Sequence, residues 1–484
     1  MIDSLRNKTL SGSFWSLADN LAGSGITFLV GLVLARLLTP QEYGVIGIIM
    51  IFIAVFNSIV DSGFSNALIR KNDADDTDYN TVFFFNLLIS VLLFFVLYFS
   101  ANAISSYFNI PILVPVTKVM ASIVIINAFA IIQRTLLVKN IDFKTQMKVS
   151  LIASIVSGIV GIGMAVMGYG VWSLVGQQVS RQLMNSVFLW IFNKWRPRLT
   201  VSGKSFRELF GFGWKLLVSG LIDTIWKQIY QVVIGKCYSA ETLGHYTRAE
   251  QFNQIFSSNL TAVVHRVSYP ALSKIQDEKE RLKQAYRKVI KTTMLVTFPC
   301  MLGLAAVARP MILVLIGEQW LPCVPYLQII CLSGMLYPLH ALNLNMLQVK
   351  GRSDVYLILE IVKKTIAVGP ILLGIFINIY WMLIGSVFTG FIAYYLNGHY
   401  SGREIDYPCR EQVLDIMPTF LISLSMAAVV FDMSYLNISA FVIFPLQLIV
   451  GFGIMIGLCE MLKLNEYQEL KSVLLGFIKK RKNG

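Results

Sequence analysis

Charged side chains are scarce in this chain. Asp, Glu, Lys and Arg make up only 14% of its 484 residues, whereas 56% of the residues are hydrophobic. The mean hydropathy is accordingly positive, at +0.65. Because soluble domains carry about 25% charged residues, this composition excludes a soluble globular protein and predicts an integral membrane protein.

Histidine and cysteine are also few, with four and six residues. The cysteines form no C-x-x-C pair and lie mostly in or beside apolar segments, at Cys237, Cys300, Cys323, Cys331, Cys409 and Cys459. Neither a disulfide framework nor a metal site has this spacing, and buried cysteines act as small apolar residues. We therefore expect no bound metal and no cofactor.

Long polar segments and catalytic motifs are missing as well. The joints between apolar segments are too short to hold a folded soluble domain. The glycines of "GIGMAV" at 161–166 lie inside an apolar run with no strand before them, so they are packing glycines rather than a phosphate loop. A membrane-embedded glycosyltransferase or polymerase needs a sizeable outer loop or domain for its catalytic residues. We therefore expect a protein that is not an enzyme.

Apolar runs fill most of the chain. A hydrocarbon core about 30 Å thick needs about 20 apolar residues in each helix that crosses it. The expected spans are 12–35, 43–67, 80–101, 112–133, 149–168, 170–192, 209–235, 245–265, 292–313, 324–347, 355–377, 379–398, 413–431 and 437–459. The sequence thus predicts an all-α, multi-pass membrane protein of about fourteen helices.

Positive charge is unevenly placed. A net charge of +14 would suggest a nucleic-acid partner in a soluble protein, but most of the 41 Lys and Arg residues lie in joints on one side of the predicted topology. The opposite joints hold Arg36, Lys236, Arg248 and Arg309. The positive-inside rule makes the basic side and both termini cytoplasmic. No nucleic acid is expected.

Two basic segments have apolar residues at helical spacing. They are the joint "KIQDEKERLKQAYRKVIK" and the tail "LNEYQELKSVLLGFIKKRKNG". Such segments bind anionic lipid surfaces. We expect both to lie along the inner leaflet.

A weak internal repeat divides the chain. Trp15 aligns with Trp214, Gly44 of "TPQEYG" with Gly244 of "SAETLG", and "LLVK" with the later "LQVK". The predicted parts are an N-terminal lobe (1–192), a cytoplasmic joint (193–208), a C-terminal lobe (209–398), helices 13 and 14 (399–459) and a basic cytoplasmic tail (460–484). In transporters with such repeats the substrate site lies between the halves, which rock against each other.

Several ionisable side chains fall inside or beside the predicted spans, where they are costly and usually face a cavity or a bundle interior. The stretch "GWKLLVSGLIDTIWKQIYQVVIGK" carries three of them, and Asp223 and Lys227 are spaced to pair. The predicted cavity residues are Lys215, Lys227, Arg248, Lys363, Lys364 and Trp214, the last as a surface for stacking on a sugar. The predicted ion-coupling or pairing acids are Asp19, Asp61, Asp223, Glu250 and Glu360.

The depth of these residues in the membrane supports a common cavity. At a rise of about 1.5 Å per residue, Asp19, Asp61 and Lys215 each lie roughly 11 Å from the cytoplasmic end of their spans. Glu360 and Lys364 repeat the four-residue spacing, and Arg181 stands alone in the sixth span. The alternative is that such charges join helices or reach the span ends. That explanation suits Arg36, Lys118, Lys236 and Arg309.

Seven stretches carry a family resemblance. They are "LARLLTPQEYGVIGI", "DSGFSNALIRK", "IIQRTLLVKNIDFK", "GYGVWSLVGQQ", "IGKCYSAETLGHYTRAEQF", "VSYPALSKIQDEKERLKQAYRK" and "IGEQWLPCVPYLQIICLSG". They resemble the polysaccharide exporters, or lipid-linked oligosaccharide flippases (Wzx-type), of the multidrug/oligosaccharidyl-lipid/polysaccharide (MOP) superfamily. The resemblance implies a fold like that of the multidrug and toxin extrusion (MATE) transporters, with two six-helix lobes around a central cavity and two C-terminal helices.

The resemblance also implies a function. It is the flipping of undecaprenyl-diphosphate-linked oligosaccharides across a bacterial cytoplasmic membrane for O-antigen, capsule or exopolysaccharide synthesis. The implied partners are that lipid-linked substrate, membrane lipids, the polysaccharide polymerase and export machinery, and a coupling proton or sodium ion. The alternative is a cation-coupled multidrug exporter of the same fold, whose usually cationic substrates suit the two lysines of the seventh span less well.

Overall fold

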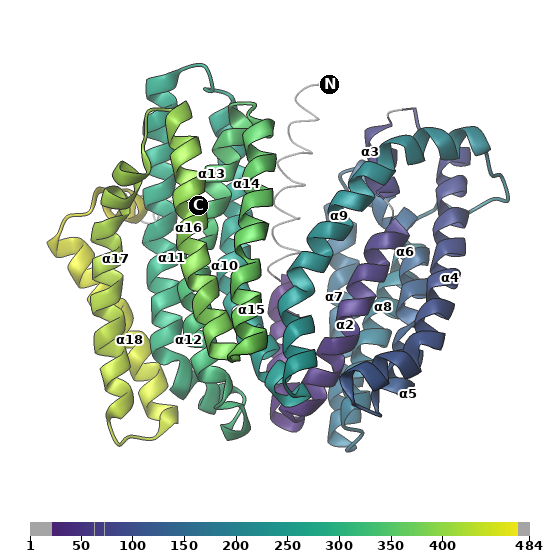
Figure 1. The fold of residues 1–484 in the computed structure, drawn as a ribbon, viewed down its shortest axis with the longest axis horizontal. Helices are drawn as coiled ribbons and strands as arrows, with labels where there is room; N and C mark the ends of the chain where they lie inside the picture. Colours follow the sequence, from purple (N-terminus) through teal and green to yellow (C-terminus); the bar gives the residue numbers. More distant parts are fainter. Residues whose placement is uncertain (1–21, 62, 72, 473–484) are drawn as a thin grey trace, which may run out of the picture. The chain divides into compact units, whose positions relative to one another are not determined.

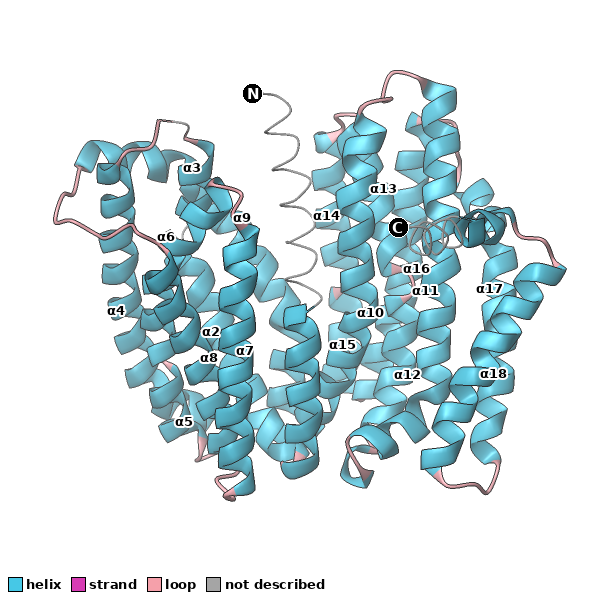
Figure 2. Cartoon of the chain, turned by 180° about the vertical axis from the view of Figure 1, so that it is seen from behind, coloured by secondary structure: helices cyan, strands magenta, loops and turns pink. Residues whose placement is uncertain are grey.

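The computed structural model describes residues 22–61, 63–71 and 73–472, and over these ranges the chain forms helices and no strands (Figures 1 and 2). The chain folds into two compact units, Met1–Thr247 and Arg248–Gly484. The boundary falls inside one continuous helix, α10 (Ala240–Ser273). The predicted inter-lobe joint at 193–208 therefore precedes the boundary between the units.

The N-terminal unit begins, in its described part, with a helix at Ala22–Leu37. The helices that follow are α2 (Pro40–Asp61), α3 (Phe64–Arg70), α4 (Asp76–Phe108), α5 (Leu113–Met120), α6 (Ser122–Lys139), α7 (Phe143–Val166), α8 (Val171–Phe192) and α9 (Gly203–Cys237). α7 and α8 form a hairpin whose turn contains Gly168 and Gly170, with φ of 81° and 56°. Glycine adopts these positive φ angles without strain, so the backbone can make the sharp turn between α7 and α8.

A lysine ties three helices of this unit together. Asp75 and Asp78 form a capping box at the start of α4. The Lys71 ammonium lies 2.9 Å from the Asp78 carboxylate and 3.1 Å from that of Glu208 in α9. The hydrogen bond to Asp78 raises the pKa of Lys71 above its usual value, so the cation persists and holds the start of α9 near α3 and α4.

The C-terminal unit contains most of α10 and the rest of the chain. Its further helices are α11 (Lys279–Leu315), α12 (Cys323–Gly334), α13 (Tyr337–Val349), α14 (Ser353–Ile366), α15 (Val368–Phe376), α16 (Ile379–Glu404), α17 (Cys409–Asp432) and α18 (Ala440–Met461). The predicted spans 324–347 and 355–377 are each broken in two. Pro338 and Pro370 explain the breaks. A proline removes the backbone hydrogen bond to the carbonyl four residues earlier. These carbonyls belong to Gly334 and Ile366, the last residues of α12 and α14.

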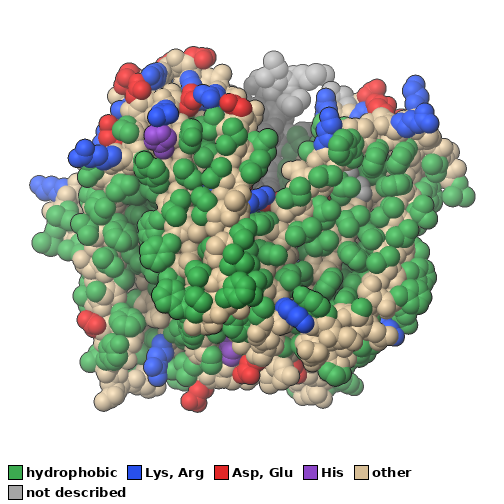
Figure 3. All heavy atoms as spheres, in the orientation of Figure 1, with side chains coloured by type: hydrophobic (Ala, Val, Ile, Leu, Met, Phe, Trp, Pro, Cys, Tyr) green, Lys and Arg blue, Asp and Glu red, His purple; other side chains and the backbone are tan. Residues whose placement is uncertain are grey.

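Ten described helices are long and apolar enough to cross a membrane. On the face shown in Figure 3, hydrophobic side chains cover the middle of each unit and most charged ones gather at its ends. Four predicted spans fall outside that set of ten: the shorter helix Ala22–Leu37, α8, α10 and the pair α14–α15. The all-α, multi-pass prediction is confirmed, whereas the count of fourteen and the cytoplasmic termini remain predictions.

The basic joint predicted to lie along the inner leaflet is largely the first part of α11. Its cations pair with acidic groups of the same unit: Lys279 with Asp406, Lys283 with Glu411, Arg287 with Asp415, Lys288 with Glu469 and Lys291 with Glu466. These pairs connect α11 to the joint before α17, to α17 itself and to the segment after α18. The charges of this segment thus hold helices together, a role that the sequence interpretation missed.

The pair between Arg287 and Asp415 yields a stability prediction. Arg287 makes two contacts of 2.5 Å with the Asp415 carboxylate, which is only 9% exposed and also accepts a 2.6 Å bond from Tyr407. Arg287→Ala removes the counter-ion of this nearly buried carboxylate, and breaking such a pair costs about 3 kcal/mol. We expect a clearly lower thermal midpoint for the purified protein in detergent. Arg281→Ala is the control, because Arg281 and Glu278 are 69% and 54% exposed and such pairs contribute under about 1 kcal/mol. Equal midpoints for the two variants would contradict the prediction.

Candidate functional site

α9 has the lowest hydropathy of the ten candidate spans, and only 11% of its most apolar 18 residues are buried. Trp214 is 44% exposed, and Lys215 next to it is exposed. The predicted pair of Asp223 and Lys227 forms, with a nitrogen–oxygen distance of 2.7 Å and exposed fractions of 49% and 70%. A charged pair this exposed in the middle of a candidate spanning helix is costly against hydrocarbon, so we expect this part of α9 to border water.

Packing of α9 on α2 and α3 sets the direction of Lys215. Gly63 has φ of 69°, and a Cβ there would lie 2.4 Å from the carbonyl oxygen of Gly213. The backbones can approach so closely only because residue 63 is glycine. Residues two apart on a helix lie on nearly opposite sides, about 200° apart. Lys215 therefore points away from the core of its unit.

The two lysines of α9 do not share a face. They are twelve residues apart, which corresponds to roughly 18 Å along the axis and a rotation of about 120°. Lys215 has no hydrogen-bond or ion-pair partner among the described residues, whereas Lys227 is held by Asp223. Two separated cations suit a long ligand with more than one polar part better than a compact one.

Asp61 lies at the end of α2 and is hydrogen-bonded. Its carboxylate accepts a short bond from Ser65, and the Ser65 hydroxyl accepts one of 3.1 Å from Thr135 of α6. These bonds favour the alternative explanation, in which Asp61 joins helices. Asp19, its predicted neighbour in depth, lies outside the described residues.

A neutral polar chain in the same unit was missed by the sequence interpretation. Gln182 of α8 donates 2.7 Å to Asn127 of α6, which donates 3.0 Å to Asn57 of α2. The three residues are 55 and 70 positions apart along the chain. A search for charged residues cannot find them, although "GQQVSRQLMN" in the middle of a span is a usable signal.

Arg248 and Glu250 lie near the start of α10. Arg248 is only 2% exposed. Its guanidinium lies over the Trp320 ring, 5.3 Å from the centroid, and donates 3.0 Å to Gln251. Glu250 accepts 3.1 Å from Gln254. The burial of Arg248 and its cation–π contact favour a packing role, so we leave it out of the site proposed below.

α14 carries the predicted charged residues Glu360, Lys363 and Lys364. Glu360 pairs with Lys363, three residues further along the helix, at 2.5 Å. Lys363 is 16% exposed and Glu360 29%. Nearby in the same unit, Asn343 accepts bonds of 3.1 Å from Tyr286 and 2.5 Å from Ser401. The C-terminal unit therefore has polar contacts inside its own bundle.

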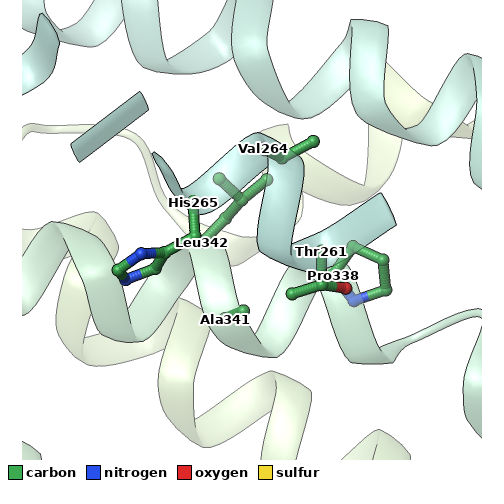
Figure 4. A pocket seen from close by; sticks show the side chains of 6 residues that line it. All are labelled: Thr261, Val264, His265, Pro338, Ala341 and Leu342. Atoms are coloured by element: carbon green, nitrogen blue, oxygen red, sulfur yellow. The ribbon is translucent and has the colours of Figure 1, made fainter. Parts of the chain in front are cut away.

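A small hollow lies between α10 and α13 (Figure 4). Its lining is Thr261, Val264, His265, Pro338, Ala341 and Leu342, and its cavity volume is about 0 Å³. Ligand pockets usually measure about 300–1,000 Å³, so a sugar unit does not fit. Among the described residues, no three His, Cys, Asp or Glu side chains are grouped closely enough to hold a metal ion.

Solved structures share this fold. The lipid II flippase MurJ in an inward closed conformation matches with a TM-score of 0.75 at 17% identity, over 95% of this chain and 99% of that one. An inward-facing multidrug resistance MATE family transporter of the MOP superfamily matches with a TM-score of 0.60 at 17% identity, over 81% of this chain and 94% of that one. The chain thus has the fold of the MOP-superfamily membrane transporters.

Sequence comparison gives the family. The chain is 27% identical over 354 residues to the teichuronic acid biosynthesis protein TuaB of Bacillus subtilis (strain 168), covering 72% of this chain and 73% of that protein. It is 24% identical over 377 residues to the lipopolysaccharide biosynthesis protein WzxC of Escherichia coli (strain K12), covering 77% and 76%. The model of a family described as polysaccharide biosynthesis protein matches residues 33–325. The chain belongs to this family, and the predicted resemblance is confirmed.

Proposed function

We propose that this protein is a flippase, and not an enzyme, that moves undecaprenyl-diphosphate-linked oligosaccharides across a bacterial cytoplasmic membrane. The product would serve O-antigen, capsule or exopolysaccharide synthesis. Family membership and the MOP-superfamily fold support the proposal. The observation that carries it is the exposure of Lys215 and of the Asp223–Lys227 pair in an otherwise apolar spanning helix.

The chemistry of the substrate explains the need for these charges. A diphosphate and a glycan cannot enter hydrocarbon without losing their hydrogen bonds to water. Lysine ammonium groups offset that loss with charge-assisted bonds to phosphate, and the exposed Trp214 ring provides a face for a sugar. The polyprenyl tail stays in the bilayer, so a polar path for the head group suffices.

In the proposed mechanism two six-helix halves of a fourteen-helix protein, with both termini in the cytoplasm, open alternately to either side of the membrane. Lys215, Lys227 and Trp214 bind the head group, and Lys363 and Lys364 of the C-terminal unit are further candidates for binding it. The candidates for ion coupling or for pairing are Asp19, Asp61, Asp223, Glu250 and Glu360, and the bond from Ser65 favours pairing for Asp61. The polymerase and export machinery then take the flipped product.

A transport assay tests the function. Purified protein in proteoliposomes would be supplied with a fluorescent undecaprenyl-diphosphate oligosaccharide, and a membrane-impermeant quencher would report the lipid that has reached the other leaflet. We expect protein-dependent movement of this lipid and no uptake of a cationic dye under a proton or sodium gradient. Dye transport without lipid movement would replace the flippase by the multidrug exporter of the same fold.

A further inference from the structure

The middle of α8 is unusually polar for a spanning helix. Gln178, Arg181, Gln182 and Asn185 follow one another at helical spacing, and all four are partly buried. Arg181 lies ten residues from Val171 and eleven from Phe192, the two ends of α8, which is roughly 15 Å from either end. In the predicted span 170–192 this is near the depth where an arginine is most costly in a membrane.

Two contacts define the direction of Arg181. On one side of α8, Gln177 packs closely against Gly161 of α7. A Cβ added at Gly161 would lie only 2.9 Å from the Gln177 Cβ and 3.5 Å from the Leu34 side chain. On the other side, Gln182 donates to Asn127 of α6. At about 100° per residue, Arg181 lies between these two directions. It is therefore directed into the N-terminal unit, between α7 and α6.

The guanidinium has no acceptor among the residues that the structure describes. Within residues 22–61, 63–71 and 73–472, Arg181 makes no hydrogen bond and no ion pair, and Gln178 and Asn185 make no side-chain hydrogen bond. The buried Arg248 shows the contrast, since it has both an aromatic ring and a glutamine as partners. A guanidinium offers five donors in a planar fork and no acceptor, a geometry that matches carboxylate and phosphate oxygens.

We propose that Arg181, flanked by Gln178 and Asn185, binds an oxyanion of the translocated molecule inside the N-terminal unit. This inference rests on the proposed flippase function. The oxyanion is either the diphosphate that links lipid and glycan or the carboxylate of an acidic sugar. Because Arg181 is partly exposed, a ligand group can reach it, and the Asn57–Asn127–Gln182 chain holds α8 in place beside it.

The test compares variants on two substrates. Wild type, Arg181→Gln and Arg181→Lys would each be assayed in proteoliposomes with a neutral and with a uronic-acid-containing undecaprenyl-diphosphate oligosaccharide. Arg198→Gln serves as the matched control, because Arg198 is exposed in the loop before α9 and its hydrogen bonds are made by its backbone, from its N–H to Asn80 and to its carbonyl from the Thr200 N–H. We expect Arg181→Gln to lower the flipping rate at least tenfold, while Arg181→Lys retains flipping with a raised KM.

The pattern of loss identifies the oxyanion. If Arg181→Gln impairs both substrates, the ligand is the diphosphate; if it impairs only the acidic one, the ligand is the sugar carboxylate. Unchanged flipping of both substrates overturns the inference. Should Arg181→Gln fold poorly, an unaltered KM in the folded Arg181→Lys variant overturns it as well. A wild type that flips neither substrate refutes the proposed function instead, so the two failures are distinguishable.

Discussion

Replacing Gly44 by alanine is expected to prevent normal folding. A Cβ at this position of α2 would lie 1.7 Å from the carbonyl oxygen of Ala240, and a Cβ at Gly244 of α10 would lie 1.9 Å from that of Pro40. Both obstacles are backbone atoms, which cannot turn away as a side chain can. Overpacking typically costs about 1–3 kcal/mol when the surroundings adjust, and we expect more than that here.

The measurement is the yield of monodisperse protein in detergent and its thermal midpoint. Gly47→Ala is the matched control on the same helix, because a Cβ there would meet only the Leu243 and Thr247 side chains, at 3.5 Å. Gly44→Ala and Gly244→Ala should lose most of the folded protein, and Gly47→Ala should resemble wild type. Similar midpoints for all three variants would show that α2 and α10 separate without penalty at this crossing.

Removing the charge of Lys215 is expected to have the largest effect on transport. Lys215→Ala should lower flipping of the lipid-linked oligosaccharide by about tenfold or more, because a hydrogen bond from a charged group contributes about 1.5–3 kcal/mol. Folding should be unaffected, since Lys215 is exposed and points away from its unit. Lys215→Arg, which keeps the charge, should retain much of the rate. A Lys215→Ala rate equal to wild type would mean that the site lies elsewhere.

Lys227 calls for a different design because it is paired. Lys227→Ala should also impair flipping, but it leaves Asp223 without its partner. The double variant Asp223→Ala/Lys227→Ala removes both charges. If Lys227 binds substrate, the double variant stays inactive; if Lys227 only neutralises the Asp223 carboxylate, the double variant recovers wild-type flipping.

The candidate site was predictable in part. Lys215, Asp223 and Lys227 are recognisable because three charges interrupt one apolar run, and the i,i+4 spacing alone predicts their pair. The pair of Glu360 with Lys363 was not predictable, because Lys363 and Lys364 both lie within helical reach and rotamers and packing decide which contact forms. The role of Arg248 was not predictable, since nothing in the sequence connects it with Trp320.

Composition and periodicity by themselves determined that this chain is an all-helical membrane protein, since apolar content and span length depend only on the order of residues and the thickness of a bilayer. The repeat also aligned Gly44 with Gly244. Only the tertiary structure decided that these glycines lie at one close crossing of α2 and α10. It also decided that the cations of α11 pair within their unit and that Arg181 lacks a described partner. Such contacts depend on which helix faces meet, and helices far apart in sequence meet through side-chain packing that no local pattern records.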